Sequence, residues 1–187
     1  MPLRDELAEQ HWSFMDRYAG AMIARGPTMT ADGSAATGSV HIVGLPDADA
    51  ARVFAFEEPN YRAGVYGEVL ISRWRDMLGR TMWEFGAEAP GSQRFLILGH
   101  GARGLAATAG ELAAEYRRFI STDGAGERLI ACGPLLSEDG SGWAGTALLA
   151  ELPGRASAEA ILAAGPYCRA GGYASIEVHR WQFGGRD

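Results

Sequence analysis

The chain contains 187 residues, 47% hydrophobic and 21% charged, which is typical of a folded globular protein and excludes a mainly disordered chain. The formal charge of -6 and the lack of a basic block argue against a nucleic-acid or anionic-membrane partner. No apolar run approaches the roughly 18 residues of a membrane span. The charged N-terminus also lacks the apolar core of a signal peptide. We therefore expect a cytoplasmic protein without a membrane partner.

The cysteine and histidine content does not indicate a metal site. Cys132 and Cys168 are expected to be buried small hydrophobes, because a disulfide is uncommon in a cytosolic chain. The four histidines are scattered and form no HxxxH or CxxC pairing. No Ser-His-Asp order, P-loop or dinucleotide fingerprint is present either. The sequence therefore predicts no metal and no cofactor.

An internal repeat organises the chain. Residues 26–74 align without a gap with residues 133–181, so that Gly26 recurs as Gly133 at a shift of 107. Five short motifs stay in register between the two copies: Gly-Pro, Asp-Gly-Ser, Leu-Pro, Arg-Ala-Gly and Arg-Trp. The helix upstream repeats at a shift of 105. Two copies indicate a duplicated small domain rather than a solenoid, and we place the units at 1–86 and 93–187.

The second copy has the pattern of a complete α+β unit. We expect strands near 94–98, 127–136, 143–151 and 173–181, and helices over 107–120 and 156–164. This order, strand-helix-strand-strand-helix-strand, is ferredoxin-like, with both helices on one face of a four-stranded antiparallel sheet. The other face needs a partner sheet, which the duplication supplies within one chain.

The first copy begins at a helix over residues 3–18 and lacks the opening strand. Either this strand lies upstream of the sequence as given, or another segment fills its place. We predict that 81–85 pairs as a strand with a strand over 66–75 and occupies the empty slot. A β-arm that crosses between the two repeats is the alternative.

These residues resemble the YCII-related domain family. The resemblance rests on His11 in the first helix, Gly26-Pro27, Asp32-Gly33, Glu58-Pro59, Arg62-Ala63-Gly64-Val65-Tyr66 and Arg73-Trp74, with partial copies in the second repeat. It implies two tandem ferredoxin-like units that form an intramolecular pseudo-dimeric α/β barrel. The family implies a small, often aromatic ligand and a His–carboxylate dyad, and one known activity is the dehydrochlorination of a hydroxyquinol.

His11 and Glu58 are the predicted catalytic residues. A carboxylate beside an imidazole holds its tautomer and raises its basicity, so the pair can transfer a proton near neutral pH. Glu58 stands where the family usually has the shorter Asp. The second copy has Tyr116 and Gly165 at these positions. In the alternative interpretation, His11 lies at a helix surface or core edge and Glu58 is a solvated charge.

Four further residues are predicted to bind the substrate: Arg62, Tyr66, His41 and Arg73. An arginine can bind an anion or a carbonyl group. It can also cap the carbonyls of a turn or pair across an interface, which is the simpler interpretation here. His41 lies on a predicted strand and either lines a pocket or faces solvent.

The sequence supports two main functional hypotheses. The first is a cofactor-independent enzyme that uses His–carboxylate acid–base chemistry on a small cyclic or aromatic substrate, as a lyase or isomerase does. The second is a non-catalytic small-molecule-binding or accessory barrel protein. A structural partner of another barrel protein is a third interpretation. We also expect a homodimer of pseudo-dimers.

Overall fold

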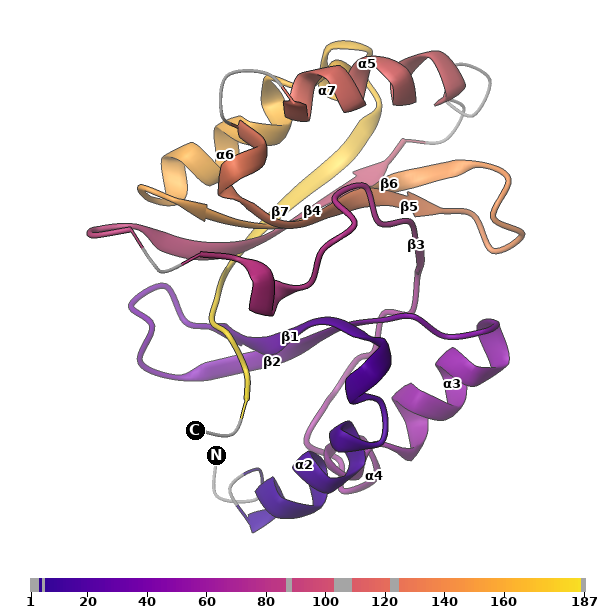
Figure 1. Ribbon diagram of the computed structural model, residues 1–187, viewed down its shortest axis with the longest axis vertical. Coiled ribbons are helices and arrows are strands. Elements are labelled where there is room, and N and C mark those ends of the chain that lie inside the picture. The colour runs from indigo at the N-terminus through magenta and orange to yellow at the C-terminus, as the bar shows by residue number, and fades with distance from the viewer. Residues whose placement is uncertain (1–3, 5, 87–88, 103–108, 122–124, 186–187) are drawn as a thin grey trace.

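The computed structural model describes residue 4 and residues 6–86, 89–102, 109–121 and 125–185. It is an α+β structure in which one curled antiparallel sheet of seven strands carries helices on its outer side. Figure 1 shows two layers of strands that face each other, with one group of helices above and another below. Among the described residues, no helix is both long and apolar enough to cross a membrane.

The second half has the element order that the sequence predicts. Its elements, in chain order, are β4 (Gln93–Gly101), α5 (Ala109–Ser121), the 3₁₀ helix η4 (Ala125–Arg128), β5 (Leu129–Leu136), β6 (Trp143–Leu152), α6 (Arg155–Ala163), α7 (Pro166–Arg169) and β7 (Tyr173–Trp181). The strands lie in the order β7-β4-β6-β5. All three helices cover the outer face of this part of the sheet (Figure 1). The expected helix start at 107–108 lies outside the described residues.

Burial explains why these segments form strands and helices. Nine of the ten residues of β6 are buried, because the strand is central and both its faces are covered. On the outer face Ile97 and Leu148 pack with Tyr116 and Leu162 from the helices. On the inner face Leu149 packs in a second cluster that faces the opposite layer.

The first half contains fewer strands. Its elements are α2 (Ala8–Asp16), the 3₁₀ helix η1 (Ala19–Ala21), β1 (Met22–Met29), β2 (Ala36–Val43), α3 (Ala48–Glu57), α4 (Pro59–Arg62), β3 (Arg73–Trp74) and the 3₁₀ helix η2 (Met82–Glu84). The predicted strand over 66–75 is therefore wrong for most of its length, because only residues 73–74 pair with another strand. The predicted helix over 3–18 is shorter, and residues 1–3 and 5 lie outside the described part.

The predicted strand over 81–85 is also wrong. Residues 82–84 form a helical turn, because the Glu84 carboxylate accepts hydrogen bonds from the Thr81 amide at 2.7 Å and from the Thr81 hydroxyl at 2.9 Å. Met82 is buried between the two layers, where it packs with Ala24 and Trp181. Figure 1 shows η2 between β1 and the upper strands.

Two short strand pairings join the halves of the sheet. In one, Thr28 faces Trp181 as β1 meets β7, and in the other, Leu135 faces Trp74 as β5 meets β3. A shift of 107 residues converts the first pair into the second. The continuing backbone bonds repeat in the same way: the Gln182 amide donates to the Pro27 carbonyl, and the Arg75 amide donates to the Pro134 carbonyl, both at 3.1 Å.

The complete strand order is β2-β1-β7-β4-β6-β5-β3. β2 and β3 are the two ends of the sheet, and within the described ranges no strand lies between them. The sheet is therefore a curled, open half-barrel rather than a closed one.

Candidate functional site

His11 and Glu58 meet in the first half, although 47 residues separate them in sequence. His11 lies on α2, and its Nδ1 is 2.6 Å from Glu58 Oε1. Both side chains are buried, with 8% of His11 and 3% of Glu58 exposed. A carboxylate at this distance accepts the Nδ1 proton and leaves Nε2 as the nitrogen that can exchange a proton with another molecule. The two predicted catalytic residues thus form one buried pair.

The start of α4 holds Glu58 in place. Glu58 is the N-cap of this helical turn, and its Oε2 accepts a hydrogen bond from the Tyr61 amide at 2.9 Å. Pro59 follows as the first helical residue, which suits its fixed φ and missing N–H. Burial opposes ionisation of Glu58, but hydrogen bonds from His11 and from the Asn60 and Tyr61 amides outweigh burial and lower its pKa. Glu58 is therefore a carboxylate at neutral pH.

His41 lies beside the pair on the helix-facing side of β2. Its ring centroid is 5.9 Å from that of His11 and 5.6 Å from that of Phe54. Burial among these rings, with the neighbouring positive charge that His11 can carry, lowers the pKa of His41 well below its ordinary value. The negative charge of Glu58 raises the pKa of His41, but by less than burial and His11 lower it. His41 is therefore a neutral imidazole that can donate or accept one hydrogen bond.

Asn60 and Tyr66 bring two unsatisfied polar atoms to the same region. Asn60 is 1% exposed, and neither its Oδ1 nor the buried Tyr66 hydroxyl has a hydrogen-bond partner among the described residues. Burial, and then the negative charge of Glu58, raise the pKa of Tyr66, while the nearby Ser39 and Asn60 act in the opposite direction. Buried polar groups without partners are uncommon and require an explanation. Bound ligand groups would satisfy both atoms.

Asn60 was not predicted from the sequence. The available signal was its place two residues after Glu58 within a motif that the second repeat keeps only in part, where Tyr167 replaces Asn60. The first repeat thus has the polar Asn60 where the second has the aromatic Tyr167. This difference next to Glu58 could have identified Asn60 as a candidate site residue.

The two predicted arginines do not join this site. Arg62 is exposed on α4. Arg73 is exposed on β3 and lies against the turn at Gly140, where its guanidinium is 2.9 Å from the position that a Cβ would occupy. Its repeat partner Arg180 lies against Gly33 in the same way and donates to the Ala31 carbonyl at 3.2 Å. These contacts fit the interpretation in which the recurring arginines hold turns across the two halves.

The equivalent region of the second half is filled by aromatic rings. Tyr116 occupies the position of His11, and its hydroxyl is 3.6 Å from the Cys132 sulfur. Tyr167 stacks on Trp143 with ring centroids 4.4 Å apart. The Tyr173 hydroxyl donates to the Thr146 hydroxyl at 2.8 Å. This region has no carboxylate at the position of Glu58, so it lacks the acid–base pair.

The remaining two histidines also meet through a carboxylate. His100 Nε2 lies 2.8 Å and His179 Nε2 lies 3.0 Å from the two oxygens of Glu177. These three side chains are partly exposed, and hydrogen bonding by His179 is the main reason that the pKa of Glu177 is lowered. The four histidines are scattered in sequence but form two pairs in space. Within the described chain, no cluster of His, Cys, Asp or Glu has the arrangement of a metal site.

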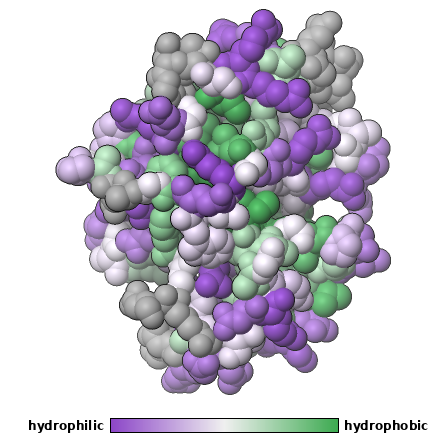
Figure 2. Space-filling model, in the orientation of Figure 1, coloured by the Kyte–Doolittle hydropathy of each residue, from purple (hydrophilic) through white to green (hydrophobic). Residues whose placement is uncertain are grey.

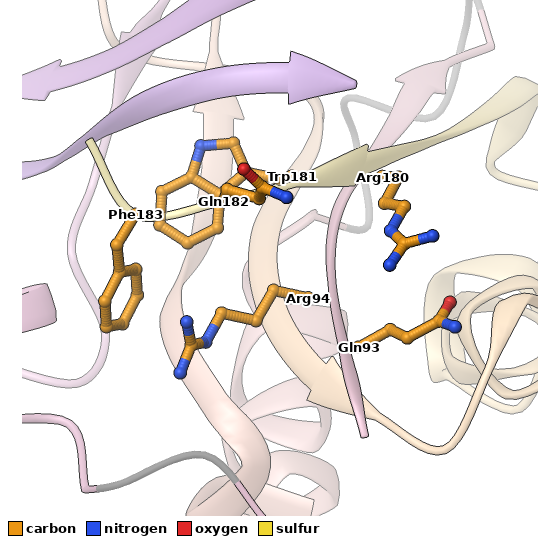
Figure 3. A pocket seen from close by; sticks show the side chains of 6 residues that line it. All are labelled: Gln93, Arg94, Arg180, Trp181, Gln182 and Phe183. Carbon is orange, nitrogen blue, oxygen red and sulfur yellow. The ribbon is translucent and has the colours of Figure 1, made fainter. Parts of the chain in front are cut away.

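Two surface cavities lie away from the His11–Glu58 pair. One, of about 270 Å³, is lined by residues of β4 and β7 and by those after β7, which are shown in Figure 3: Gln93, Arg94, Arg180, Trp181, Gln182 and Phe183. Arg94 is ion-paired with Glu151 at 3.1 Å and stacks on Phe183 at 4.0 Å, so its charge is already compensated. The second cavity, of about 460 Å³, lies near Arg80, Phe85 and Pro153. Neither contains His11, Glu58, His41 or Tyr66.

Comparison with solved structures gives the general architecture. A candidate monooxygenase from Lactobacillus acidophilus NCFM has a TM-score of 0.51 and 7% identity, covering 96% of this chain and 89% of that chain. Another, from Fusobacterium nucleatum, has a TM-score of 0.44 and 9% identity, covering 95% of this chain and 86% of that one. The likeness to the first protein shows a shared fold and nothing about the reaction.

A third solved structure is similar to about half of the chain. It is the 5-chloro-2-hydroxyhydroquinone dehydrochlorinase of Burkholderia phenoliruptrix AC1100 in complex with 2,5-dihydroxybenzoquinone, with 22% identity and a TM-score of 0.43. The match covers 49% of this chain and 95% of that chain. No curated protein matches the chain.

The model of the YCII-related domain matches residues 1–75 and again residues 94–182. The two matched segments contain the two copies of the repeat and together cover most of the chain. The chain therefore belongs to the YCII-related domain family.

Proposed function

We propose that the protein is a cofactor-independent enzyme that transfers a proton on a small cyclic or aromatic substrate, in a lyase or isomerase reaction. The observation that carries the proposal is the buried contact of 2.6 Å between His11 Nδ1 and Glu58 Oε1. In the alternative interpretation Glu58 is a solvated charge, but both side chains of the pair are buried. Burying an ionised carboxylate costs free energy that its partners must offset, and ionisable groups in such surroundings cluster at functional sites.

In this mechanism His11 is the general base and Glu58 is a positioning residue. Glu58 accepts the Nδ1 proton, so that the lone pair of Nε2 is directed away from the carboxylate. Nε2 removes a proton from a carbon or hydroxyl group of the substrate and later returns it to the product or a leaving group. Glu58 stabilises the imidazolium that forms between these two steps.

Three neighbouring side chains would bind the substrate. His41 supplies a neutral imidazole, Tyr66 a protonated hydroxyl and Asn60 an amide, and the last two have polar atoms that lack partners. These groups suit a ligand with hydroxyl or carbonyl oxygens rather than a strongly charged one. Arg62 and Arg73 do not lie at this site, and their substrate-binding role is not part of the proposal.

We also propose that residues 1–86 and 93–187 are two ferredoxin-like units arranged as an intramolecular pseudo-dimeric α/β barrel. The support is the repetition of the two joining pairs, Thr28 with Trp181 and Leu135 with Trp74, at the same shift of 107 residues. A two-fold relation between the units produces such reciprocal contacts. Cytoplasmic location and a homodimer of pseudo-dimers stay predictions.

The test is a turnover assay with small cyclic and aromatic compounds, namely hydroxylated benzenes, quinones and lactones. For a substrate that is converted, we expect His11→Gln to lower kcat by about 10²–10⁴-fold, the usual contribution of a general base. Tyr116→Phe is the matched control, because Tyr116 holds the equivalent place in the second half and should leave kcat within about twofold. Equal turnover by the wild type and His11→Gln would contradict the proposal.

A non-catalytic small-molecule-binding or accessory protein is the second candidate. The absence of the pair from the second repeat and the presence of Glu rather than the shorter Asp favour it. A ligand that binds the wild type and His11→Gln with equal affinity, and is never converted, would establish this alternative.

A further inference from the structure

β4 and β7 move apart at the cavity of about 270 Å³ that Figure 3 shows. Their ladder ends where Phe95 faces Arg180, and the next residue of β7, Trp181, faces Thr28 of β1. The cavity is lined by the first residues of β4 and by the residues at and after the end of β7. Its volume is just below the roughly 300–1,000 Å³ of pockets for drug-sized ligands, so it suits a smaller molecule.

Arg180 brings to this cavity a positive charge that no carboxylate neutralises in the described part of the chain. Its guanidinium donates to the neutral Ala31 carbonyl at 3.2 Å. Asp32 is next in sequence, but its carboxylate accepts hydrogen bonds from Thr30 and Ser34 within the same turn. A guanidinium has five N–H donors in a planar fork that matches an oxyanion, so Arg180 can bind one and keep its bond to Ala31.

Two carboxamides add uncharged donors to the cavity. Among the residues that the structure describes, the side chains of Gln93 and Gln182 have no hydrogen-bond partner. Side chains alternate along a strand, and Phe95 and Val178 both pack under the helices, so Gln93 and Arg180 lie on that same side of the sheet. In Figure 3 these two side chains extend to one side of the cavity. An anion beside Arg180 is therefore within the part of the cavity where amide donors are also available.

Arg94 forms the opposite wall and already has its counter-charge. Its Nε is 3.1 Å from Glu151 Oε2, and its guanidinium lies 4.0 Å from the centroid of the Phe183 ring, toward which it extends in Figure 3. The other oxygen of Glu151 accepts a hydrogen bond from the Ala89 amide at 2.8 Å. Because the charges of Arg94 and Glu151 compensate each other, Arg180 supplies the net charge of the cavity.

The join of β5 with β3 has the same turn contact without these donors. Arg73, the counterpart of Arg180, lies against the Gly140 turn as Arg180 lies against its own turn. β3 has β5 on one side, but in the described structure no strand lies where β7 has β4, so a counterpart of Gln93 is lacking. Both arginines thus contact a turn, whereas only Arg180 also lines the cavity with its carboxamides.

We propose that this cavity binds a small oxyanion, a carboxylate or phosphate group, through the Arg180 guanidinium and the carboxamides of Gln93 and Gln182. The anion neutralises Arg180 and accepts N–H groups that have no other partner. Because Arg180 also donates to Ala31 in the β1–β2 turn, a bound anion links the two halves at the join of β1 with β7. The cavity does not contain His11, so the proposal is independent of the proposed activity.

The test is a ¹⁵N NMR titration of the whole chain with sodium acetate and, separately, with inorganic phosphate. Sodium chloride at the same ionic strength is the reference. We expect saturable shifts of the Arg180 Nε–H signal and of the side-chain amide signals of Gln93 and Gln182 with at least one oxyanion, and no saturable shift with chloride. A response to acetate alone would assign a carboxylate ligand, and a response to phosphate alone a phosphate ligand.

Three variants distinguish the cavity from a general effect of charge. Arg180→Gln should weaken binding by at least about tenfold, because it removes the charge-assisted hydrogen bonds. Gln93→Ala should weaken it by about threefold, the effect of one neutral hydrogen bond. Arg73→Gln is the matched control and should leave the affinity within about twofold, because a distant exposed charge is screened.

Two results would overturn the proposal. The first is a set of shifts that do not saturate with acetate or with phosphate, or that chloride reproduces. The second is an affinity that Arg180→Gln and Arg73→Gln reduce equally or that neither reduces, because binding would then not depend on the cavity. Each result concerns binding alone and leaves the proposed proton transfer at His11 unaffected.

Discussion

The equivalent regions of the two halves carry opposite chemistry on the same framework. In the first, His11 and Glu58 form a buried ionisable pair next to His41. In the second, Tyr116 and Tyr167 belong to a cluster of packed rings with ordinary core contacts. One region is built of titratable side chains and the other of packed aromatic rings, so under the proposed function the duplication separates reactivity from stability.

The outer surfaces differ too. Val53 and Phe56 of α3 are 49% and 41% exposed, and Figure 2 shows apolar surface on the side of the molecule where α3 lies. Their repeat counterparts are Ala160 and Ala163 on α6, whose small side chains expose little apolar surface. The first half thus leaves more of its apolar residues accessible, as expected of the less completely covered unit.

The largest effect should come from the aromatic cluster. Trp143→Ala removes a buried ring that stacks on Tyr167, and we expect it to lower the free energy of unfolding by about 3–5 kcal/mol. Trp83→Ala is the control, because Trp83 is 53% exposed and should change stability by less than about 0.5 kcal/mol. Urea denaturation measures the free energy of unfolding of both variants. Equal losses for Trp143→Ala and Trp83→Ala would show that the aromatic cluster of the second half does not stabilise the protein as proposed.

Glu58→Ala should have the next largest effect. It removes an N-cap, worth about 1 kcal/mol, and a charge-assisted hydrogen bond to His11, worth about 1.5–3 kcal/mol. Asp47 is a matched control because its carboxylate caps α3 through the Ala50 amide without a histidine partner. Asp47→Ala should cost about 1 kcal/mol in the same urea experiment, and an equal cost for both variants would contradict the buried pair.

His41→Leu should change the pH dependence of stability. The folded-state pKa of His41 lies below the ordinary 6.5, so below that pH the unfolded chain binds more protons than the folded one. Stability is then lost as the pH falls from 6.5, by at most about 1.4 kcal/mol per unit for one group. Leu148 occupies the equivalent position, and the leucine variant should lose this part of the slope in urea titrations between pH 6.5 and 4.5. An unchanged slope would show that His41 titrates normally.

Glu58 contributes a slope at lower pH. Its folded-state pKa is lowered from 4.5, so its stabilising effect is present above that pH and is lost as the pH falls through the lowered value. Measurements above pH 4.5 therefore separate the contribution of His41 from that of Glu58.

The smallest effect should come from the arginines that hold turns across the halves. Arg180→Ala and Arg73→Ala should each lower the free energy of unfolding by less than about 1 kcal/mol, because Arg73 is exposed and Arg180 is only partly buried. The two costs should agree within about 0.5 kcal/mol if the contacts are equivalent. A much larger cost for Arg73 than for Arg180 would point to a separate role for that residue.

The sequence predicted the second half well because each of its strands has its partner within the same repeat. β7 matches the predicted range 173–181, and β6 differs from its prediction by one residue. Residues 66–72 have the same pattern as their counterparts but form no strand, because a ladder requires a neighbour that the described chain does not supply. The predicted strand over residues 81–85 is wrong for another reason: the Thr81–Glu84 hydrogen bonds favour a helical turn.

The candidate site was only partly accessible from sequence. The pairing of His11 with Glu58 followed from the family resemblance, and the repeat comparison showed that only one half has it. The unpartnered atoms of Asn60 and Tyr66 depend on how α4 and the residues after it pack in the first half, where α4 contacts α2 and α3, and no local pattern encodes this packing. The placement of Arg73 at the Gly140 turn depends on the join between the two halves.

The most direct test of the central claim is the protonation of the His11 ring nitrogens, measured by ¹⁵N NMR of the imidazole at a pH where the ring is neutral. The account predicts a proton on Nδ1 and a bare Nε2 in the wild type, and loss of this preference in Glu58→Ala. A proton on Nε2 in the wild type, or identical spectra for both proteins, would contradict the claim that Glu58 orients His11 as a base.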